Sequence, residues 1–117
     1  MNLICWNCRG LGNRQLVQEL GELVRAQDPI IVFLAETWLE EARLGTIRDS
    51  LQFNHYHGVS RITRGGGLAI FWKNGFNLEV ESSSQNHIDV VINKGKDNVW
   101  RFTGIYGVLE THLQSET

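Results

Sequence analysis

The chain has 117 residues, of which 42% are hydrophobic and 21% charged, and its formal net charge is −2. This composition suits one globular domain with a buried core and excludes a disordered chain. The charge excludes a strongly basic nucleic-acid-binding surface, although a bound metal ion can still supply local positive charge for nucleic acid. No apolar run reaches the roughly 18–20 residues that cross a bilayer, so we expect no membrane partner.

The cysteines and the first residues indicate the cellular compartment. Met1 is followed directly by an apolar segment, without the basic stretch and the cleavage site of a secretory signal. Two cysteines without such a signal indicate reduced thiols inside a cell. We therefore expect an intracellular protein of the nucleus or cytoplasm that is not secreted.

The first half of the chain alternates expected strands and helices. Residues 2–7 are mostly apolar, which predicts a first strand. Apolar residues at helical spacing predict a helix over 14–26, and Asn13 is suited to cap it. The uninterrupted apolar run 30–35 is typical of a strand buried on both faces. Strands that alternate with helices in this way predict an α/β fold that begins with a parallel pair.

The second half of the chain predicts antiparallel strands. Before them, Thr37 and Glu40 have the spacing of a capping box, which predicts a second helix over about 39–48. Short strands are then expected at 52–59, 68–72, 76–81, 88–92 and 99–106. Asn74-Gly75 between two of these runs predicts a two-residue hairpin. The expected fold is therefore α/β with a mixed sheet, parallel at the start and then an antiparallel meander.

Three further motifs are interpreted as structural. Cys5 and Cys8 have redox or zinc spacing, but Cys5 falls within a strand and no second ligand pair exists, which favours inert buried thiols. His55 and His57 share one face of a strand without a third ligand nearby in the sequence. The segment 64–67 lacks the phosphate-loop pattern, and its glycines favour the close approach of another backbone segment.

Polar residues at strand ends are the strongest candidates for chemistry. Asn7 and Glu36 follow two strands that a right-handed crossover would make parallel neighbours, so both should emerge at one edge of the sheet. Tyr106 closes the last expected strand and is able to reach the same edge. A carboxylate, a carboxamide and a phenol suit a magnesium ion and a phosphate group, although Glu36 on its own also fits a simple return of the chain to solvent.

Four segments resemble, in order, the motifs of the endonuclease/exonuclease/phosphatase superfamily, which includes DNase I and the apurinic endonucleases. They are most similar to the endonuclease domain that opens the reading frame of plant LINE-type non-LTR retrotransposons. The segments are Cys5–Gly12, Phe33–Trp38, Gly66–Trp72 and Thr103–Gly107. The resemblance implies that residues 1–117 are a single, C-terminally truncated domain, the first half of a four-layer α/β/β/α sandwich with two helices on one face of a mixed sheet.

The resemblance also implies a function and the residues that carry it. The family hydrolyses phosphodiester bonds with Mg²⁺ or Mn²⁺, and nucleic acid, with DNA favoured, is the implied partner. Glu36 matches the metal-binding glutamate, and Asn7 matches a catalytic asparagine that helps to hold the metal and the phosphate. Tyr106 matches a catalytic tyrosine that contacts the scissile phosphate. Arg9 departs from the aspartate that some apurinic endonucleases carry there, so metal coordination from this position is not implied.

Later family motifs do not occur in the 117 residues. The family pattern continues with an Asp-x-Asn motif and a terminal Asp-His pair that activates water, and His112 does not match that base. We therefore expect a half-site with negligible nuclease activity, with most of the second sheet missing and self-association through the exposed sheet face. The alternative is a non-catalytic remnant or binding module that retains part of the fold.

Overall fold

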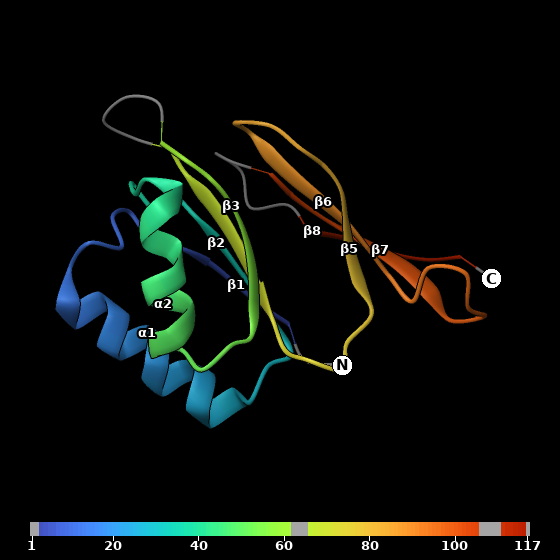
Figure 1. The fold of residues 1–117 in the computed structure, drawn as a ribbon, viewed down its shortest axis with the longest axis horizontal. Coiled ribbons are helices and arrows are strands. Elements are labelled where there is room, and N and C mark those ends of the chain that lie inside the picture. Colours follow the sequence, from blue (N-terminus) through green and yellow to red (C-terminus); the bar gives the residue numbers. More distant parts are fainter. Residues whose placement is uncertain (1–2, 62–65, 106–110, 117) are drawn as a thin grey trace.

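The computed structural model describes residues 3–61, 66–105 and 111–116. Two helices cover one side of a first four-stranded sheet, here called sheet A. A second four-stranded sheet, sheet B, packs against the other side of sheet A, so that the described chain forms three layers (Figure 1). The expected α/β class, with a mixed sheet and two helices on one of its faces, is confirmed.

Sheet A has the strand order β1-β2-β4-β3. Its strands are β1 (Leu3–Asn7), β2 (Ile31–Ala35), β3 (His55–Val59) and β4 (Leu68–Trp72). The first two are parallel, whereas β4 is antiparallel to both of its neighbours. Each residue of β2 is buried, as its uninterrupted apolar run predicts for a central strand with a layer on both faces.

Helix α1 (Arg14–Gln27) forms where the apolar spacing predicts it. The side chain of Asn13 accepts a hydrogen bond of 2.9 Å from the backbone N–H of Gln15, which satisfies one of the free amides of the first turn. The second helix is shorter than expected. A single 3₁₀ turn, η1 (Glu41–Arg43), leads into α2 (Leu44–Ser50).

The capping box expected at Thr37 and Glu40 is wrong. The hydroxyl of buried Thr37 accepts a hydrogen bond from the backbone N–H of Leu39 at 3.4 Å, within the loop that follows β2. The amide of Glu41 instead donates to the hydroxyl of Ser60 at 2.7 Å, which lies just after β3. The helix starts later because this loop is tied to other strand ends and does not turn directly into a helix.

Sheet B has four strands and forms a second β layer. Its strands are β5 (Leu78–Ser83), β6 (His87–Ile92), β7 (Val99–Ile105) and β8 (Thr111–Glu116), in this order and all antiparallel. The expectation that most of the second sheet is missing is therefore wrong. Strand β8 was not expected from the sequence, and the remaining strands lie within a few residues of their predicted positions.

The expected hairpin at Asn74-Gly75 is also wrong. Strand β4 pairs with β2 and β3, whereas β5 pairs with β6, so this turn carries the chain from sheet A to sheet B. The backbone N–H of Asn74 donates to the side chain of Asn54 at 2.8 Å, which holds the turn against the residue before β3. A turn does form at Asn74-Gly75, but its two flanking strands pair in different sheets.

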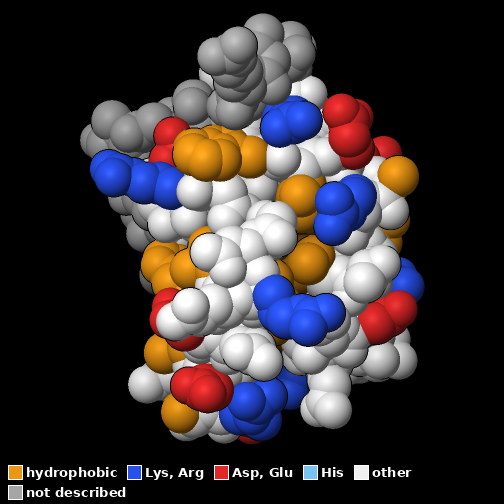
Figure 2. Space-filling view, turned by 90° about the vertical axis from the view of Figure 1, so that its left-hand side faces the viewer, with side chains coloured by type: hydrophobic (Ala, Val, Ile, Leu, Met, Phe, Trp, Pro, Cys, Tyr) orange, Lys and Arg blue, Asp and Glu red, His pale blue; other side chains and the backbone are white. Residues whose placement is uncertain are grey.

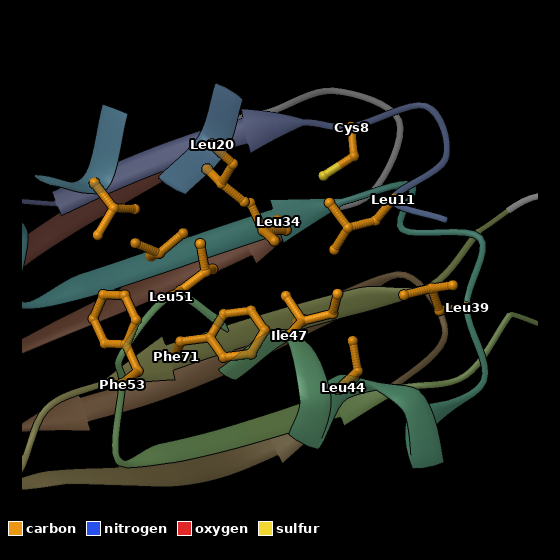
Figure 3. Packing of buried hydrophobic residues seen from close by; sticks show 13 residues of the cluster. Cys8, Leu11, Leu20, Leu34, Leu39, Leu44, Ile47, Leu51, Phe53 and Phe71 are labelled. Atoms are coloured by element: carbon orange, nitrogen blue, oxygen red, sulfur yellow. The ribbon is translucent and has the colours of Figure 1, made fainter. Parts of the chain in front are cut away.

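Two hydrophobic cores hold the three layers together. The first lies between the helices and sheet A, where the labelled side chains of Figure 3 point toward one another from α1, α2 and the sheet. Its buried members are Cys8, Leu11, Leu20, Val24, Val32, Leu34, Leu39, Leu44, Ile47, Leu51, Phe53, Ala69 and Phe71.

The second core lies between the two sheets. Phe33 of β2 and Phe102 of β7 are fully buried and meet edge to face with ring centroids 5.5 Å apart. Gly104 of β7 has no side chain where Phe33 lies against it, and this allows the sheets to approach. The face of sheet A that we expected to be exposed is therefore covered, which removes the basis for self-association through that face.

No helix in the described part of the chain has the length and apolarity needed to cross a membrane.

Candidate active site at the strand ends of sheet A

All four strands of sheet A end or begin at one edge of the sheet. Asn7, the last residue of β1, is paired with Ala35, the last residue of β2. Ala35 is also paired with Leu68 at the start of β4, and Leu68 is paired with Val59 at the end of β3. Glu36 follows Ala35 directly, so the structure places Asn7 and Glu36 at the same edge, as the sequence predicted. We call this pair the strand-end site.

The loop after β1 is bound to the loop after β2 by a ladder of backbone hydrogen bonds. These bonds run from Cys8 N–H to the Ala35 carbonyl (2.8 Å), from Gly10 N–H to the Glu36 carbonyl (2.9 Å) and from Leu11 N–H to the Thr37 carbonyl (2.8 Å). The backbone that carries the strand-end site is therefore fixed by bonds that extend the pairing of β1 and β2 beyond the strands.

The loop before β4 joins the same network. Thr37 N–H donates to the Gly67 carbonyl at 3.1 Å, and Trp38 N–H donates to the Gly66 carbonyl at 2.9 Å. A Cβ atom at Gly67 would collide with the Thr37 hydroxyl, so only glycine permits this approach. This close approach of another backbone segment is the role expected for the glycines of 64–67, and it is confirmed for the two that are described.

Left-handed backbone is concentrated around the strand-end site. Arg9, Glu36 and Trp38 have φ angles of 50°, 54° and 57°, which residues other than glycine rarely adopt. Such residues persist where the surrounding structure determines their conformation, and they are frequent at functional sites. The hydrogen-bond network of the two loops supplies that constraint here.

The donors of the strand-end site fit a divalent metal ion. Asn7 Oδ1 is buried and has no hydrogen-bond partner in the described part of the chain. An unsatisfied buried acceptor costs about 1–3 kcal/mol, and a cation would remove that cost. Glu36 directly follows the neighbouring strand β2 and is half-buried. Mg²⁺ is often held by only one or two protein carboxylates together with water and phosphate oxygens.

The other candidate ligands do not add to this site. Among residues 3–61 and 66–105, no group of three or more His, Cys, Asp and Glu side chains is arranged to hold a metal ion. His55 stacks on Trp72 and bonds to the side chain of Asn74 at 2.6 Å, and His57 bonds to the hydroxyl of Ser83 at 3.0 Å. Both histidines therefore form hydrogen bonds to other side chains of the fold, in agreement with their structural interpretation.

The two cysteines lie in different cores and form no pair. Cys8 is buried in the core beneath the helices, and Cys5 packs against the core between the sheets. Burial raises the pKa of Cys5 to about 11, and burial together with the negative charge of Glu36 raises the pKa of Cys8 to about 12. Both are protonated thiols at neutral pH, in agreement with their interpretation as inert. The effect on Cys8 also places the Glu36 carboxylate in its electrostatic vicinity.

A shallow groove of about 390 Å³ lies between the loops that follow β1, β2 and β3. It is lined by Arg9, Gly10, Gly12, Asn13, Trp38 and Arg61, and we call it the Trp38 groove. Trp38 is 40% exposed, which is unusual for so large an apolar side chain, and both arginines are exposed. The helical face of the molecule carries scattered basic and acidic side chains and no continuous basic surface (Figure 2).

Tyr106, the third residue predicted for the site, lies outside the described residues. Strand β7, which precedes it, ends at Ile105.

The family of the chain follows from comparison with known proteins. The model of the endonuclease/exonuclease/phosphatase family matches residues 4–111, which is nearly the whole chain. The chain belongs to this family. No curated protein sequence matches it.

Several solved structures are similar to the chain in fold. The AP endonuclease LMAP from Leishmania major has a TM-score of 0.62 at 16% identity, with 92% of this chain and 40% of that one covered. The 3'-5' exonuclease NExo from Neisseria meningitidis has a TM-score of 0.61 at 17% identity, with 90% and 41% covered. The Neisseria 3' phosphatase NExo bound to a product DNA hairpin has a TM-score of 0.60 at 17% identity, with 90% and 40% covered.

These comparisons also set the extent of the likeness. The chain spans less than half the length of each of these three proteins. At identities of 16–17% this likeness establishes only the fold of the chain.

The sequence did not single out Trp38 and Arg61, which line the groove. Trp38 lay within a matching motif and inside the capping box expected before the second helix, and Arg61 followed an expected strand without any motif. The useful signal was the glycine pattern, because Trp38 packs against Gly10 and Thr37 packs against Gly67, where a side chain would collide with them.

Proposed function

We propose that the chain forms the N-terminal part of a metal-dependent phosphodiesterase that acts on nucleic acid, with Mg²⁺ or Mn²⁺ as the cofactor. The observation that carries the proposal is the buried, unpartnered Oδ1 of Asn7 at the end of β1, with Glu36 at the end of the neighbouring parallel strand. In open α/β sheets, ligands and chemistry gather beyond the carboxyl ends of such strands.

Each residue has a distinct role in this proposal. Glu36 supplies the carboxylate ligand, and Asn7 supplies a carboxamide oxygen to the metal or holds the phosphate beside it. A bound divalent ion would stabilise negative charge on the phosphate oxygens during hydrolysis. Tyr106 contacts the scissile phosphate, a role that rests on its match to the family motif in Thr103–Gly107.

The substrate class is supported by the neighbours and by the sequence motifs. Two of the similar structures are an AP endonuclease and an enzyme bound to a DNA hairpin, which favours DNA. The four motifs from Cys5 to Gly107 support a narrower origin, the endonuclease domain of a plant LINE-type retrotransposon. The free thiols of the two cysteines support an intracellular, nuclear or cytoplasmic location.

We further propose that the 117 residues alone have negligible turnover. They contain neither an Asp-x-Asn nor an Asp-His motif, which in this family orient the phosphate and activate water. Loss of a general base costs about 10²–10⁴-fold in rate, and loss of several residues that act as a unit is not additive. The same absence supports the alternative of a non-catalytic binding module.

Metal binding tests the proposed site directly. We expect Mn²⁺ titrated into the full 117-residue chain, followed by calorimetry or electron paramagnetic resonance, to bind at one site. Glu36→Gln should weaken this binding by at least about tenfold, because a direct ligand should matter no less than the outer-shell partners of ligands do. Glu19→Gln on the exposed face of α1 is the control of equal charge change and should leave binding unaltered. Equal affinity in wild type and Glu36→Gln would refute the site.

Plasmid nicking in Mg²⁺ separates the two candidate functions. We expect no cleavage above background by the 117-residue chain. Cleavage that Glu36→Gln abolishes would contradict the predicted inactivity while supporting the metal site. Absence of both metal binding and cleavage would favour the binding module.

A further inference from the structure

We propose that the Trp38 groove is a nucleotide subsite beside the strand-end site, in which Trp38 stacks on an unpaired base while Arg9 and Arg61 bind the adjoining phosphates. This inference rests on the proposed function, and it adds to it a preference for nucleic acid with unpaired bases next to the scissile bond.

The position of the groove follows from the chain itself. Arg9 lies two residues after Asn7, and Trp38 lies two residues after Glu36. The ladder of hydrogen bonds between the two loops includes the bond from Gly10 N–H to the Glu36 carbonyl. The backbone of both loops is therefore fixed relative to the strand-end site. We expect a strand whose scissile phosphate lies at Asn7 and Glu36 to extend over these two loops, which carry Arg9 and Trp38.

Trp38 is held in place although it is exposed. A Cβ atom at Gly10 would lie 2.6 Å from Cε3 of the Trp38 indole, so the absence of a side chain at Gly10 lets the ring rest on the loop after β1. The hydrogen bond from Trp38 N–H to Gly66 fixes the backbone at its left-handed φ of 57°. An exposed aromatic ring in a constrained conformation loses little entropy when a base stacks on it.

The two arginines provide charge for the phosphates on either side of that base. Neither Arg9 nor Arg61 forms an ion pair with a residue of the described chain, whereas Lys73 and Lys94 are paired with carboxylates. Arg61 is tied to the opposite loop by the hydrogen bond of 3.1 Å from its N–H to the carbonyl of Leu39. Both arginines line the groove and are exposed, so they are available to an anionic ligand.

An unpaired base is the ligand that this combination fits. Stacking on an aromatic side chain with cations along the backbone is the common mode for single-stranded nucleic acid, and it does not depend on the base. In an intact duplex both faces of each base are already covered by their neighbours. A duplex would therefore use the arginines but not Trp38.

Binding of labelled oligonucleotides tests the proposal. Fluorescence anisotropy is measured with the full chain in EDTA, using a single-stranded oligothymidylate and a blunt duplex of equal length. Trp38→Ala should weaken single-strand binding by about 5- to 150-fold, the range reported by alanine substitution at stacking residues. Trp38→Phe should restore most of the affinity, and duplex binding should change little in either variant. Leu23→Ala on α1, where the side chain is 38% exposed, is the matched control.

Salt dependence tests the arginines separately. Each phosphate contact to a single strand contributes about 0.7 to the slope of log affinity against log salt concentration. Arg61→Gln should reduce that slope by about this amount, and so should Arg9→Asn, in which asparagine tolerates the left-handed backbone. Arg25→Gln in the last turn of α1 should leave the slope unchanged.

The outcomes distinguish this subsite from the metal site. No measurable single-strand binding, equal loss on duplex and single strand, or wild-type affinity in a folded Trp38→Ala variant would overturn the subsite. Glu19→Gln in EDTA should bind the oligonucleotide as wild type does, because Glu19 lies on the exposed face of α1, outside both sites. Oligonucleotide binding without metal binding would refute the proposed function alone, and metal binding without any Trp38 effect would refute the subsite alone.

Discussion

Replacement of Phe33 by alanine tests the packing of the two sheets, on which the position of the strand-end site depends. Phe33 is fully buried, meets Phe102 across the inter-sheet core at 5.5 Å and lies against Gly104. Truncation of a buried Phe to Ala costs about 3–5 kcal/mol through lost transfer energy and the cavity that remains. Single domains are stable by only about 5–15 kcal/mol, so this change removes a large part of the total.

Urea unfolding followed by circular dichroism measures this loss. With a slope of about 2 kcal/mol per molar urea, the midpoint should fall by roughly 1.5–2.5 M. Leu23→Ala should change the free energy of unfolding by less than about 0.5 kcal/mol, because that side chain is exposed. In a double-mutant cycle, Phe33→Ala and Phe102→Ala should be non-additive, since the two rings are in direct contact. A loss below about 1 kcal/mol for Phe33→Ala, or strict additivity, would refute the packing of sheet B on sheet A.

Two further predictions concern the loops and the thiols. Gly67→Ala should destabilise the chain more than Gly75→Ala in urea unfolding. Both residues have φ near 80–90°, which costs alanine about 1–2 kcal/mol, but only at Gly67 does the new Cβ collide with Thr37. Similar losses for both would contradict the close approach of the two loops. The raised pKa of Cys8 should make folding stability fall as the pH rises above 9, because the thiol then ionises in the unfolded chain while it stays protonated up to about 12 in the folded one. Relative to Cys8→Ala, the wild type should lose about 1.4 kcal/mol per pH unit in this window. Parallel pH profiles of the two proteins would show that Cys8 is not buried in this way.

The strand-end site was predictable in part because it is built from one continuous strand–helix–strand segment. The apolar runs before Asn7 and Glu36 define two strands, and the helix between them requires a parallel crossover that brings both ends to one edge. No comparable rule connects the later strands. Asn74-Gly75 has hairpin chemistry, but the strands on either side found partners in different sheets. Which strand pairs with which is decided by the fit of buried faces such as Phe33 against Gly104, and no local pattern contains that information.

The Trp38 groove was not predictable for a related reason. Thr37-x-x-Glu40 matches a capping box, and local propensity therefore favours a helix start at this point. Hydrogen bonds to Gly66 and Gly67, about thirty residues further along the chain, hold the loop in a different conformation and leave Trp38 exposed. Tertiary contacts override the local preference at the place where the proposed nucleotide subsite needs a rigid, exposed ring.

The division of strands between the sheets has a consequence for the order of folding. Sheet A and both helices are formed entirely from residues up to Trp72, and sheet B entirely from residues after Phe76. During synthesis from the N-terminus, the first unit therefore has every strand partner it needs before the second has emerged from the ribosome. Until sheet B arrives, Phe33 and Ile70 remain uncovered, so the nascent chain passes through a stage at which a chaperone can bind the face that the finished protein buries.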